Sequence, residues 1–195
     1  DKRLGKDEAL EVILPYSKEK FGVPSNLHII GTMNTADRSV EALDTALRRR
    51  FSFVEMMPEY EELKKIQFDD CQWGELLKTI NSRIEALLDR DHTIGHSYFI
   101  NIKPNDTEAL KEAFTNKIIP LLQEYFYHDY EKLALILGEG FVECIEPKES
   151  KVEFARWNGK TLEKPETSRL FKIKKLDDNF NILDSIKHLL NRVAF

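Results

Sequence analysis

Apolar runs and polar turns alternate over residues 26–55 in an order that predicts strand, turn, helix and strand. An apolar run over 27–33 leads to a lone polar residue, Asn34; after a polar turn, residues 39–50 have the spacing of a short amphipathic helix. That helix ends in three consecutive arginines, just before a second apolar run over 51–54. Strands buried on both faces are typical of parallel sheets, and open α/β folds bind ligands at the carboxyl ends of such strands. We therefore expect a ligand site where the first strand ends.

The same pattern predicts elements on both sides of this stretch. Residues 11–14 and 20–23 flank a turn-rich loop and predict a β-hairpin. Downstream, apolar residues at helical spacing predict a long amphipathic helix over 73–88. Other helix signals are a cap at Asp106, Pro120 in the first turn of a new helix through Phe126, and Gly138 after a helix over Tyr130–Leu137. The segment from Tyr60 to Leu137 is thus predicted to be a small helical bundle.

Two segments depart from the helical pattern. Residues 92–99 are too short and mixed for a helix, and Gly95 predicts a special backbone turn. The tail predicts short strands at Phe141–Ile145, Lys151–Trp157 and Ser168–Ile173, closed by a helix over Asn179–Arg192. We divide the chain into an α/β part over 1–57, a helical part over 58–138 and a β-rich appendage over 139–195.

Composition places the chain among ordinary soluble proteins, with 42% hydrophobic and 32% charged residues among 195. The formal net charge of -5 argues against a generally basic nucleic-acid surface. No apolar run approaches the roughly 20 residues that span a bilayer. Cys71 and Cys144 lie far apart and outside any CxxC pair. We therefore expect no metal cluster and two reduced thiols in the cytoplasm.

Asn34 and the arginines Arg48, Arg49 and Arg50 are residue types that suit a phosphate site. An amide donates and accepts hydrogen bonds without adding negative charge beside a phosphate. An arginine at a helix end can reach a phosphate and stabilise charge in a transition state. Each feature also has a structural interpretation, because a lone Asn after a strand is commonly a turn residue and cations complement a helix C-terminus. Their combination between two predicted strands favours the phosphate site.

Two motifs carry a resemblance to a known family. Residues 33–39 (MNTADRS), followed by residues 46–53 (ALRRRFSF), resemble the signature of McrB-type proteins, the GTP-hydrolysing AAA+ subunits of modification-dependent (5-methylcytosine) restriction systems. Four shorter segments also resemble that group: 14–17 (LPYS), 21–24 (FGVP), 94–99 (IGHSYF) and 119–126 (IPLLQEYF). The resemblance covers roughly residues 11–138.

The resemblance implies roles for individual residues. Asn34 would be the sensor 1 residue, which positions the attacking water near the terminal phosphate. Arg49 or Arg50 would be the arginine finger that completes the site of the adjacent subunit. The remaining residues expected near the nucleotide or the subunit interface are Asp37, Arg38, Arg48 and His96. Asp37 and Arg38 could instead help to orient the sensor residue. A structural role for His96, satisfying a hydrogen bond at an interhelical turn, is left open beside this one.

The resemblance also implies a fold and partners. The fold would be the last strands of an AAA+ parallel sheet, followed by an α-helical lid and a small β-rich tail ending in a helix. The expected cofactor is GTP or ATP with magnesium in the full-length protein. Expected partners are further copies in a ring, taken to be a hexamer, and an McrC-type endonuclease subunit. Modified DNA would be reached through a separate N-terminal domain.

Two motifs that hold a nucleotide are missing from this sequence. A phosphate-cradling loop needs Gly-x-x-x-x-Gly-Lys-Ser/Thr, but the sequence before Gly159-Lys160-Thr161 has Phe154 where the first glycine is required. No apolar run ends in an Asp-Glu pair that could hold magnesium. We therefore expect a C-terminal fragment that alone neither binds nucleotide tightly nor hydrolyses it.

A second class of function fits the same residues. The helical bundle and the tail would then form a non-catalytic interaction or scaffold module. The three consecutive arginines Arg48, Arg49 and Arg50, which we call the arginine corner, would bind an anionic partner. The choice between GTP and ATP, and the role of residues 139–195, are left open by the sequence.

Overall fold

A computed structural model describes residues 2–34, 36, 49–64, 66–68, 71–146 and 169–193. The chain forms two compact units, residues 1–42 and residues 43–195. In the first unit, strand β1 (Glu11–Ile13) pairs antiparallel with β2 (Lys20–Gly22), with Val12 opposite Phe21. The predicted hairpin is therefore confirmed.

The buried strand expected over 27–33 is not present. The structure assigns no strand there, and the side chains at its expected centre are exposed, Ile29 by 69% and Ile30 by 93%. The second apolar run, 51–54, is likewise exposed and outside any strand. A parallel strand needs a neighbour to pair with and helices on its faces. The described residues contain only two-stranded antiparallel sheets, so the expected remnant of a parallel sheet has no partner strand among them.

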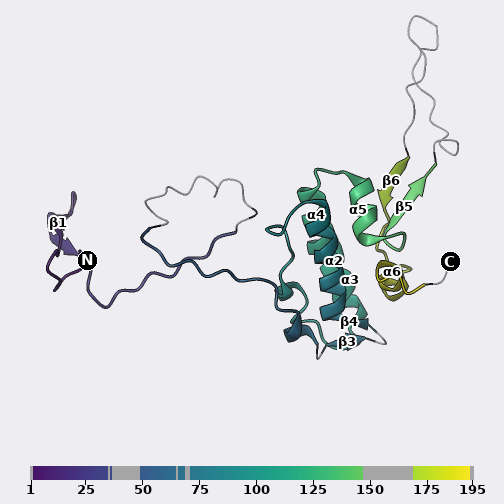
Figure 1. The fold of residues 1–195 in the computed structure, drawn as a ribbon, viewed down its shortest axis with the longest axis horizontal. Coiled ribbons are helices and arrows are strands. Elements are labelled where there is room, and N and C mark those ends of the chain that lie inside the picture. Colours follow the sequence, from purple (N-terminus) through teal and green to yellow (C-terminus); the bar gives the residue numbers. More distant parts are fainter. Residues whose placement is uncertain are drawn as a thin grey trace, which may run out of the picture. The chain divides into compact units, whose positions relative to one another are not determined.

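Helices dominate the second unit (Figure 1). Its described elements begin with the 3₁₀ turn η2 (Tyr60–Leu63), the short strands β3 (Gln67–Phe68) and β4 (Cys71–Gln72), α2 (Trp73–Leu87) and the 3₁₀ turn η3 (His96–Tyr98). They continue with α3 (Thr107–Ala113), the π-helical segment η4 (Phe114–Ile118), α4 (Ile119–Tyr125), α5 (Tyr130–Leu137), β5 (Val142–Ile145), β6 (Leu170–Ile173) and α6 (Ile182–Leu189). The predicted long helix is confirmed as α2, which buries Leu76, Leu77, Ile80 and Ile84 in the core.

Local capping signals explain where the shorter helices begin and end. The side chain of Asp106 accepts a hydrogen bond from the Ala109 N–H at 3.0 Å, as expected for the cap of α3. Asp129 caps α5 in the same way through the Lys132 N–H. Gly138 then ends α5 with φ +76°, a conformation that favours glycine. Gly95, in contrast, has φ −71° and ψ 151°, an extended conformation that other residues adopt as well. The prediction of a special backbone turn at Gly95 is therefore wrong.

Pro120 lies in the first turn of α4, as predicted, but α4 does not begin as a separate helix. Ala113, Phe114, Ile118 and Ile119 all keep right-handed helical dihedrals, so α3, η4 and α4 run on without a break. A proline ring clashes with the carbonyl four residues earlier in a regular helix. The wider π turn directly before Pro120 accommodates that clash without ending the helix.

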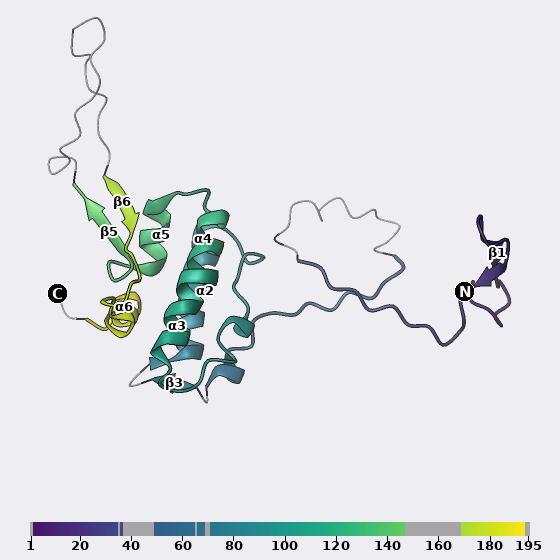
Figure 2. The same cartoon turned by 180° about the vertical axis from the view of Figure 1, so that it is seen from behind.

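The described part of the tail shares the core of the helices. Strands β5 and β6 pair antiparallel beside α5, and α6 packs against α3 (Figures 1 and 2). Phe141, Ile186 and Leu189 are buried in the same cluster as the α2 residues. Gly140 approaches α6 so closely that a Cβ atom there would lie 2.5 Å from the Ser185 Cα. Residues 43–195 form one compact unit, so the described part of the β-rich tail packs together with the helices. The strand expected over Lys151–Trp157 lies outside the described residues.

Candidate functional site

The loop that follows α2, residues 88–99, makes hydrogen bonds and ion pairs with other segments of the second unit; we call it the α2 loop. Asn81, on the buried face of α2 and only 2% exposed, holds it in place. The Asn81 Nδ2 donates to the Ile94 carbonyl at 2.9 Å, and the Ile94 N–H donates to Asn81 Oδ1 at 2.7 Å. The same Nδ2 donates to the Tyr60 hydroxyl at 3.2 Å. Asn81 thus fixes the loop to both α2 and η2.

Sequence reasoning missed Asn81, although a signal was present. Asn81 lies three residues before Ile84 and four after Leu77, inside the apolar stripe of α2. A polar residue at such a position must find hydrogen-bond partners, because an unsatisfied buried amide costs free energy. The stripe could have identified Asn81 as a residue that anchors a neighbouring segment.

A carboxylate–imidazole pair stabilises the start of the α2 loop. Asp89 Oδ1 accepts a hydrogen bond from the His92 N–H at 3.1 Å and lies 2.6 Å from the His92 Nδ1. These hydrogen bonds to His92 hold the pKa of Asp89 below its ordinary value. The His92 ring meets the ring of Tyr125 edge-on, with centroids 4.8 Å apart. Burial in turn raises the pKa of Tyr125.

The α2 loop also holds the segment that follows the arginine corner. Arg90 Nη2 lies 2.8 Å from Glu55 Oε2, and the Glu59 N–H donates to His96 Nδ1 at 3.0 Å. Because Nδ1 accepts a hydrogen bond, the neutral ring carries its proton on Nε2. His96 therefore makes the structural hydrogen bond that was one of its two expected roles.

The other predicted site residues are placed as follows. Asn34 is exposed, and its Oδ1 accepts a hydrogen bond from the Ala36 N–H at 3.1 Å, which is the geometry of a turn residue. Arg49 and Arg50 lie in an exposed turn within the same compact unit as the helices. Asn34 belongs to the first unit and the two arginines to the second. Asp37, Arg38 and Arg48 lie outside the described residues.

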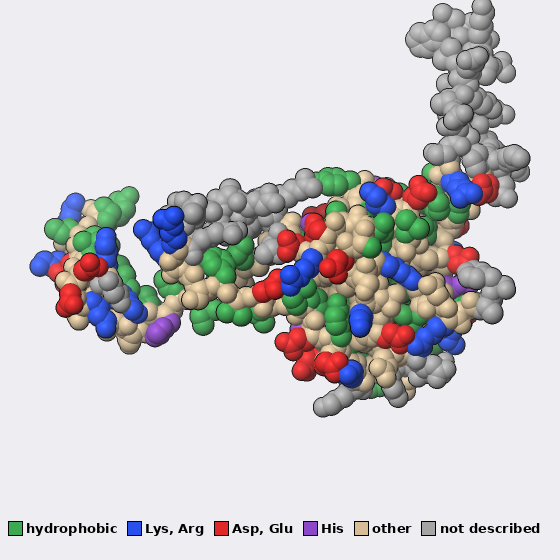
Figure 3. Space-filling model, in the orientation of Figure 1, with side chains coloured by type: hydrophobic (Ala, Val, Ile, Leu, Met, Phe, Trp, Pro, Cys, Tyr) green, Lys and Arg blue, Asp and Glu red, His purple; other side chains and the backbone are tan. Residues whose placement is uncertain are grey.

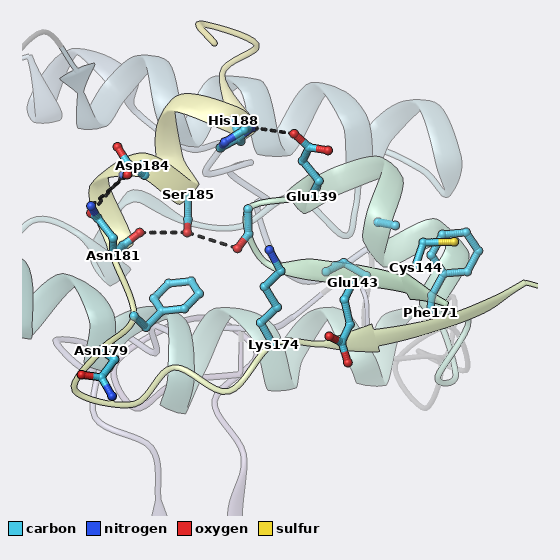
Figure 4. Close-up of a pocket in the computed structure, with 14 residues that line it drawn as sticks. Glu139, Glu143, Cys144, Phe171, Lys174, Asn179, Asn181, Asp184, Ser185 and His188 are labelled. Carbon is cyan, nitrogen blue, oxygen red and sulfur yellow. Dashed lines mark hydrogen bonds and ion pairs between the residues drawn. The ribbon is translucent and has the colours of Figure 1, made fainter. Parts of the chain in front are cut away.

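A separate pocket of about 600 Å³ is formed by the α5–β5 turn, β6 and α6 (Figure 4). Within it, the Ser185 hydroxyl lies 2.9 Å from the Asn181 carbonyl and 3.1 Å from the Gly140 carbonyl. His188 Nδ1 lies 2.9 Å from Glu139 Oε1. Since the Ser185 hydroxyl is engaged by backbone carbonyls, these residues stabilise the packing of α6 rather than form an activated nucleophile.

Charge on the helical unit is mixed. On the face shown in Figure 3, acidic and basic side chains are interspersed over the helices. Among the described residues, no group of three or more His, Cys, Asp or Glu side chains could hold a metal ion, and no helix is long and apolar enough to cross a membrane.

Comparison with protein families decides what the helical unit is. Residues 72–134, from the end of β4 through most of α5, match the model of the McrB alpha-helical lid domain. The chain carries an McrB-type lid. This match confirms the resemblance to McrB-type proteins, and the elements of that lid are α2, the α2 loop, α3, η4, α4 and the first part of α5.

Two curated proteins are similar over a longer stretch. The chain is 39% identical over 142 residues to the Type IV methyl-directed restriction enzyme EcoKMcrB subunit of Escherichia coli (strain K12), covering 63% of this chain and 31% of that protein. It is 29% identical over 144 residues to the Type II restriction enzyme BsuMI component YdiS of Bacillus subtilis (strain 168), covering 66% of this chain and 39% of that protein. The chain thus spans between 31% and 39% of the length of these relatives. It is related to McrB-type subunits of restriction systems.

Proposed function

We propose that this chain supplies the sensor, arginine-finger and lid parts of an AAA+ NTPase that assembles into a ring and drives a restriction endonuclease subunit. The observation that carries the proposal is the McrB-type lid over residues 72–134, directly downstream of the MNTADRS and ALRRRF motifs. The methyl-directed activity in the name of the E. coli relative supports a role on modified DNA. The ring is taken to be a hexamer, and the driven partner to be an McrC-type endonuclease.

Each proposed site residue has a role that its chemistry suits. The Asn34 amide would orient a water for attack on a terminal phosphate, since it can donate and accept at once. Arg49 or Arg50, exposed in its turn, would reach the site of the adjacent subunit and stabilise developing charge. Asp37, Arg38 and Arg48 would line the subunit interface.

The nucleotide itself does not fit these 195 residues alone, because the sequence has neither the glycine loop nor the acidic pair that hold phosphates and magnesium. The proposed cofactor, GTP or ATP with magnesium, therefore requires a longer protein that contains this chain. The lid and the two motifs supply only the parts named above.

A mixing experiment on the whole protein tests the assignment. Asn34→Ala impairs a subunit's own site, whereas the substitution of the finger, Arg49→Ala or Arg50→Ala, impairs the neighbour's site. The asparagine variant and the variant that removes the finger should each lose hydrolysis by about 10³-fold or more while still binding nucleotide. Mixing the asparagine variant with an arginine variant should restore part of the turnover, because some interfaces then pair an intact Asn34 with an intact finger.

The mixture separates the proposal from its alternative. Turnover that stays at the level of the single variants would rule out a finger acting between subunits. Turnover that is unchanged in both arginine variants, together with lost binding of an anionic partner, would instead support the interaction module. Lys132→Ala, on the exposed face of α5, is a control that should leave turnover unchanged.

A further inference from the structure

We propose that Arg90 and His96 are positioning residues: they fasten the segment after the arginine corner to the lid and so set how far Arg49 and Arg50 can move from it. The inference rests on the proposed function, because it assigns a purpose to the distance between the finger and the lid. We call the two contacts, Glu55 to Arg90 and Glu59 to His96, the lid clasp.

The lid clasp holds a segment that is otherwise exposed. Residues 51–57 lie in no helix or strand, and their side chains are exposed. The Glu55–Arg90 ion pair, at 2.8 Å, joins side chains 35 residues apart in the sequence. The Glu59–His96 hydrogen bond, at 3.0 Å, joins groups 37 residues apart. Both contacts lead from the arginine-bearing segment to one loop, the α2 loop.

The α2 loop is a firm support for these contacts. Asn81 holds Ile94, between Arg90 and His96, by two hydrogen bonds within the core. Thr93 adds bonds from its N–H and its hydroxyl to the Arg90 carbonyl, at 3.3 and 3.0 Å. A displacement of α2 is therefore passed to Arg90 and His96, and from them to the segment that carries the arginines.

The reach of the chain indicates what the clasp changes. Arg50 is five residues from Glu55 and nine from Glu59. An extended chain spans at most about 3.5 Å per residue, so the reach from the first anchor is roughly 17 Å and from the second roughly 31 Å. If the Glu55–Arg90 contact is lost and the Glu59–His96 contact remains, the greatest distance of Arg50 from its nearest anchor nearly doubles. A shorter reach confines the arginines to fewer positions, which favours catalysis because turnover depends on how well the reacting groups are oriented.

The hydrogen bond of the clasp can be tested on this chain without any enzyme assay. In His96→Ala the Glu59 amide loses its acceptor, and its hydrogen exchange should become about two- to ten-fold faster. In His96→Asn the side-chain oxygen can take the place of Nδ1, so exchange should stay close to the wild-type rate. Equal exchange in the wild type and in His96→Ala would overturn the clasp.

The positioning role is tested by turnover in the whole protein. Exposed ion pairs are weak, so Arg90→Ala should lower turnover at saturating nucleotide only about two- to five-fold, with KM unchanged. The charge swap Glu55→Arg with Arg90→Glu should restore turnover, which a purely structural role of Arg90 would not predict. Lys132→Ala, which breaks another exposed ion pair of the lid, serves as the control.

The outcomes distinguish this inference from the function on which it rests. If Arg49→Ala or Arg50→Ala abolishes turnover while Arg90→Ala leaves it unchanged, the positioning role is wrong and the proposed function stands. If the arginine variants also leave turnover unchanged, the proposed function fails and the positioning role falls with it. Loss of turnover in Arg90→Ala with recovery in the charge swap supports both.

Discussion

Asn81 and Ile94 hold each other by a reciprocal pair of hydrogen bonds, in which the Asn81 amide donates to the Ile94 carbonyl and accepts from the Ile94 N–H. The pair is buried, and it determines where the α2 loop leaves the core. The net contribution of such a hydrogen bond to stability is small, because the unfolded chain makes hydrogen bonds to water instead. Removing one partner, however, leaves the other buried without a hydrogen bond, which is costly.

Asn81→Leu should therefore destabilise the chain by about 2–4 kcal/mol, because two buried backbone groups of Ile94 lose their partners. The measurement is the free energy of unfolding in urea. Asn179→Ala changes an exposed Asn and should stay within about 0.5 kcal/mol of the wild type. A loss below about 1 kcal/mol for Asn81→Leu would mean that the loop finds other hydrogen bonds.

Arg83 joins the McrB-type lid to the tail. One guanidinium nitrogen donates to the Ile136 carbonyl at 2.6 Å and another to the Leu189 carbonyl at 2.7 Å, so a single side chain caps the ends of α5 and α6. Burial lowers the pKa of Arg83, but the two carbonyls are suited to its planar fork.

Arg83→Met should remove both caps and cost about 2–4 kcal/mol of unfolding free energy. Arg83→Lys should recover only part of that loss, because one ammonium group does not match two carbonyls held by different helices. Lys78→Ala, on the exposed face of the same helix, is the matched control and should have little effect. Full recovery by lysine would show that charge, and not the fork, matters at this site.

Some of these features could be predicted from the sequence and others could not. The length of α2, the cap at Asp106 and the end of α5 at Gly138 depend on residues close together in the chain, so the local pattern predicts them. The roles of Asn81 and Arg83 depend on partners 13 to 106 residues away. The spacing of residues along the chain does not tell which distant backbone group will become the hydrogen-bond partner of a given side chain.

The apolar run over 27–33 shows a second limit. Its composition is that of a buried strand, and the prediction followed from that alone. Burial, however, requires neighbouring strands and helices, and the described residues do not provide a parallel strand for it. A hydrophobic pattern indicates that a segment can form a buried strand if other strands and helices cover it. Such partners are not present among the described residues, and Ile29 and Ile30 are therefore exposed.

Tyr127 is a residue whose replacement by glycine should stabilise the chain. It follows α4 with φ +49°, and His128, with φ +61°, donates its N–H to the Gln123 carbonyl at 3.1 Å. This is the Schellman end of a helix, where glycine is the usual residue after the cap. Tyr127 is 79% exposed, so its side chain contributes little packing.

We expect Tyr127→Gly to raise the free energy of unfolding by about 0.5–1 kcal/mol, since glycine avoids the steric cost of a positive φ. Tyr127→Ala is the control, because it removes the ring and keeps the strain; it should give no gain. The melting temperature and urea titration of both variants decide the matter. Greater stability in the alanine variant would assign the effect to the ring.

We expect the stability of the chain to depend on pH through the carboxyl group of Asp89. Hydrogen bonds to His92 lower its pKa in the folded chain from the ordinary value of 3.8. Its contribution to stability is therefore present above pH 3.8 and is lost as the pH falls toward the lower folded pKa. Asp89→Asn should flatten this part of the curve of melting temperature against pH. His92→Gln, which removes the partner, should flatten it similarly; a slope that is unchanged in both variants would contradict the assignment.

These 195 residues alone should not bind a nucleotide tightly. Tight binding of GTP or ATP depends on backbone N–H groups in a glycine loop and on a carboxylate that holds magnesium. The sequence has neither, and Asn34, Arg49 and Arg50 cannot replace them because an amide and two exposed guanidinium groups provide no enclosing cradle. Titration calorimetry with either nucleotide and magnesium should therefore show no micromolar binding, whereas the whole protein measured in parallel should bind. Micromolar affinity in the isolated chain would contradict this prediction, because it would require a phosphate site made of residues other than a glycine loop and a magnesium-binding carboxylate.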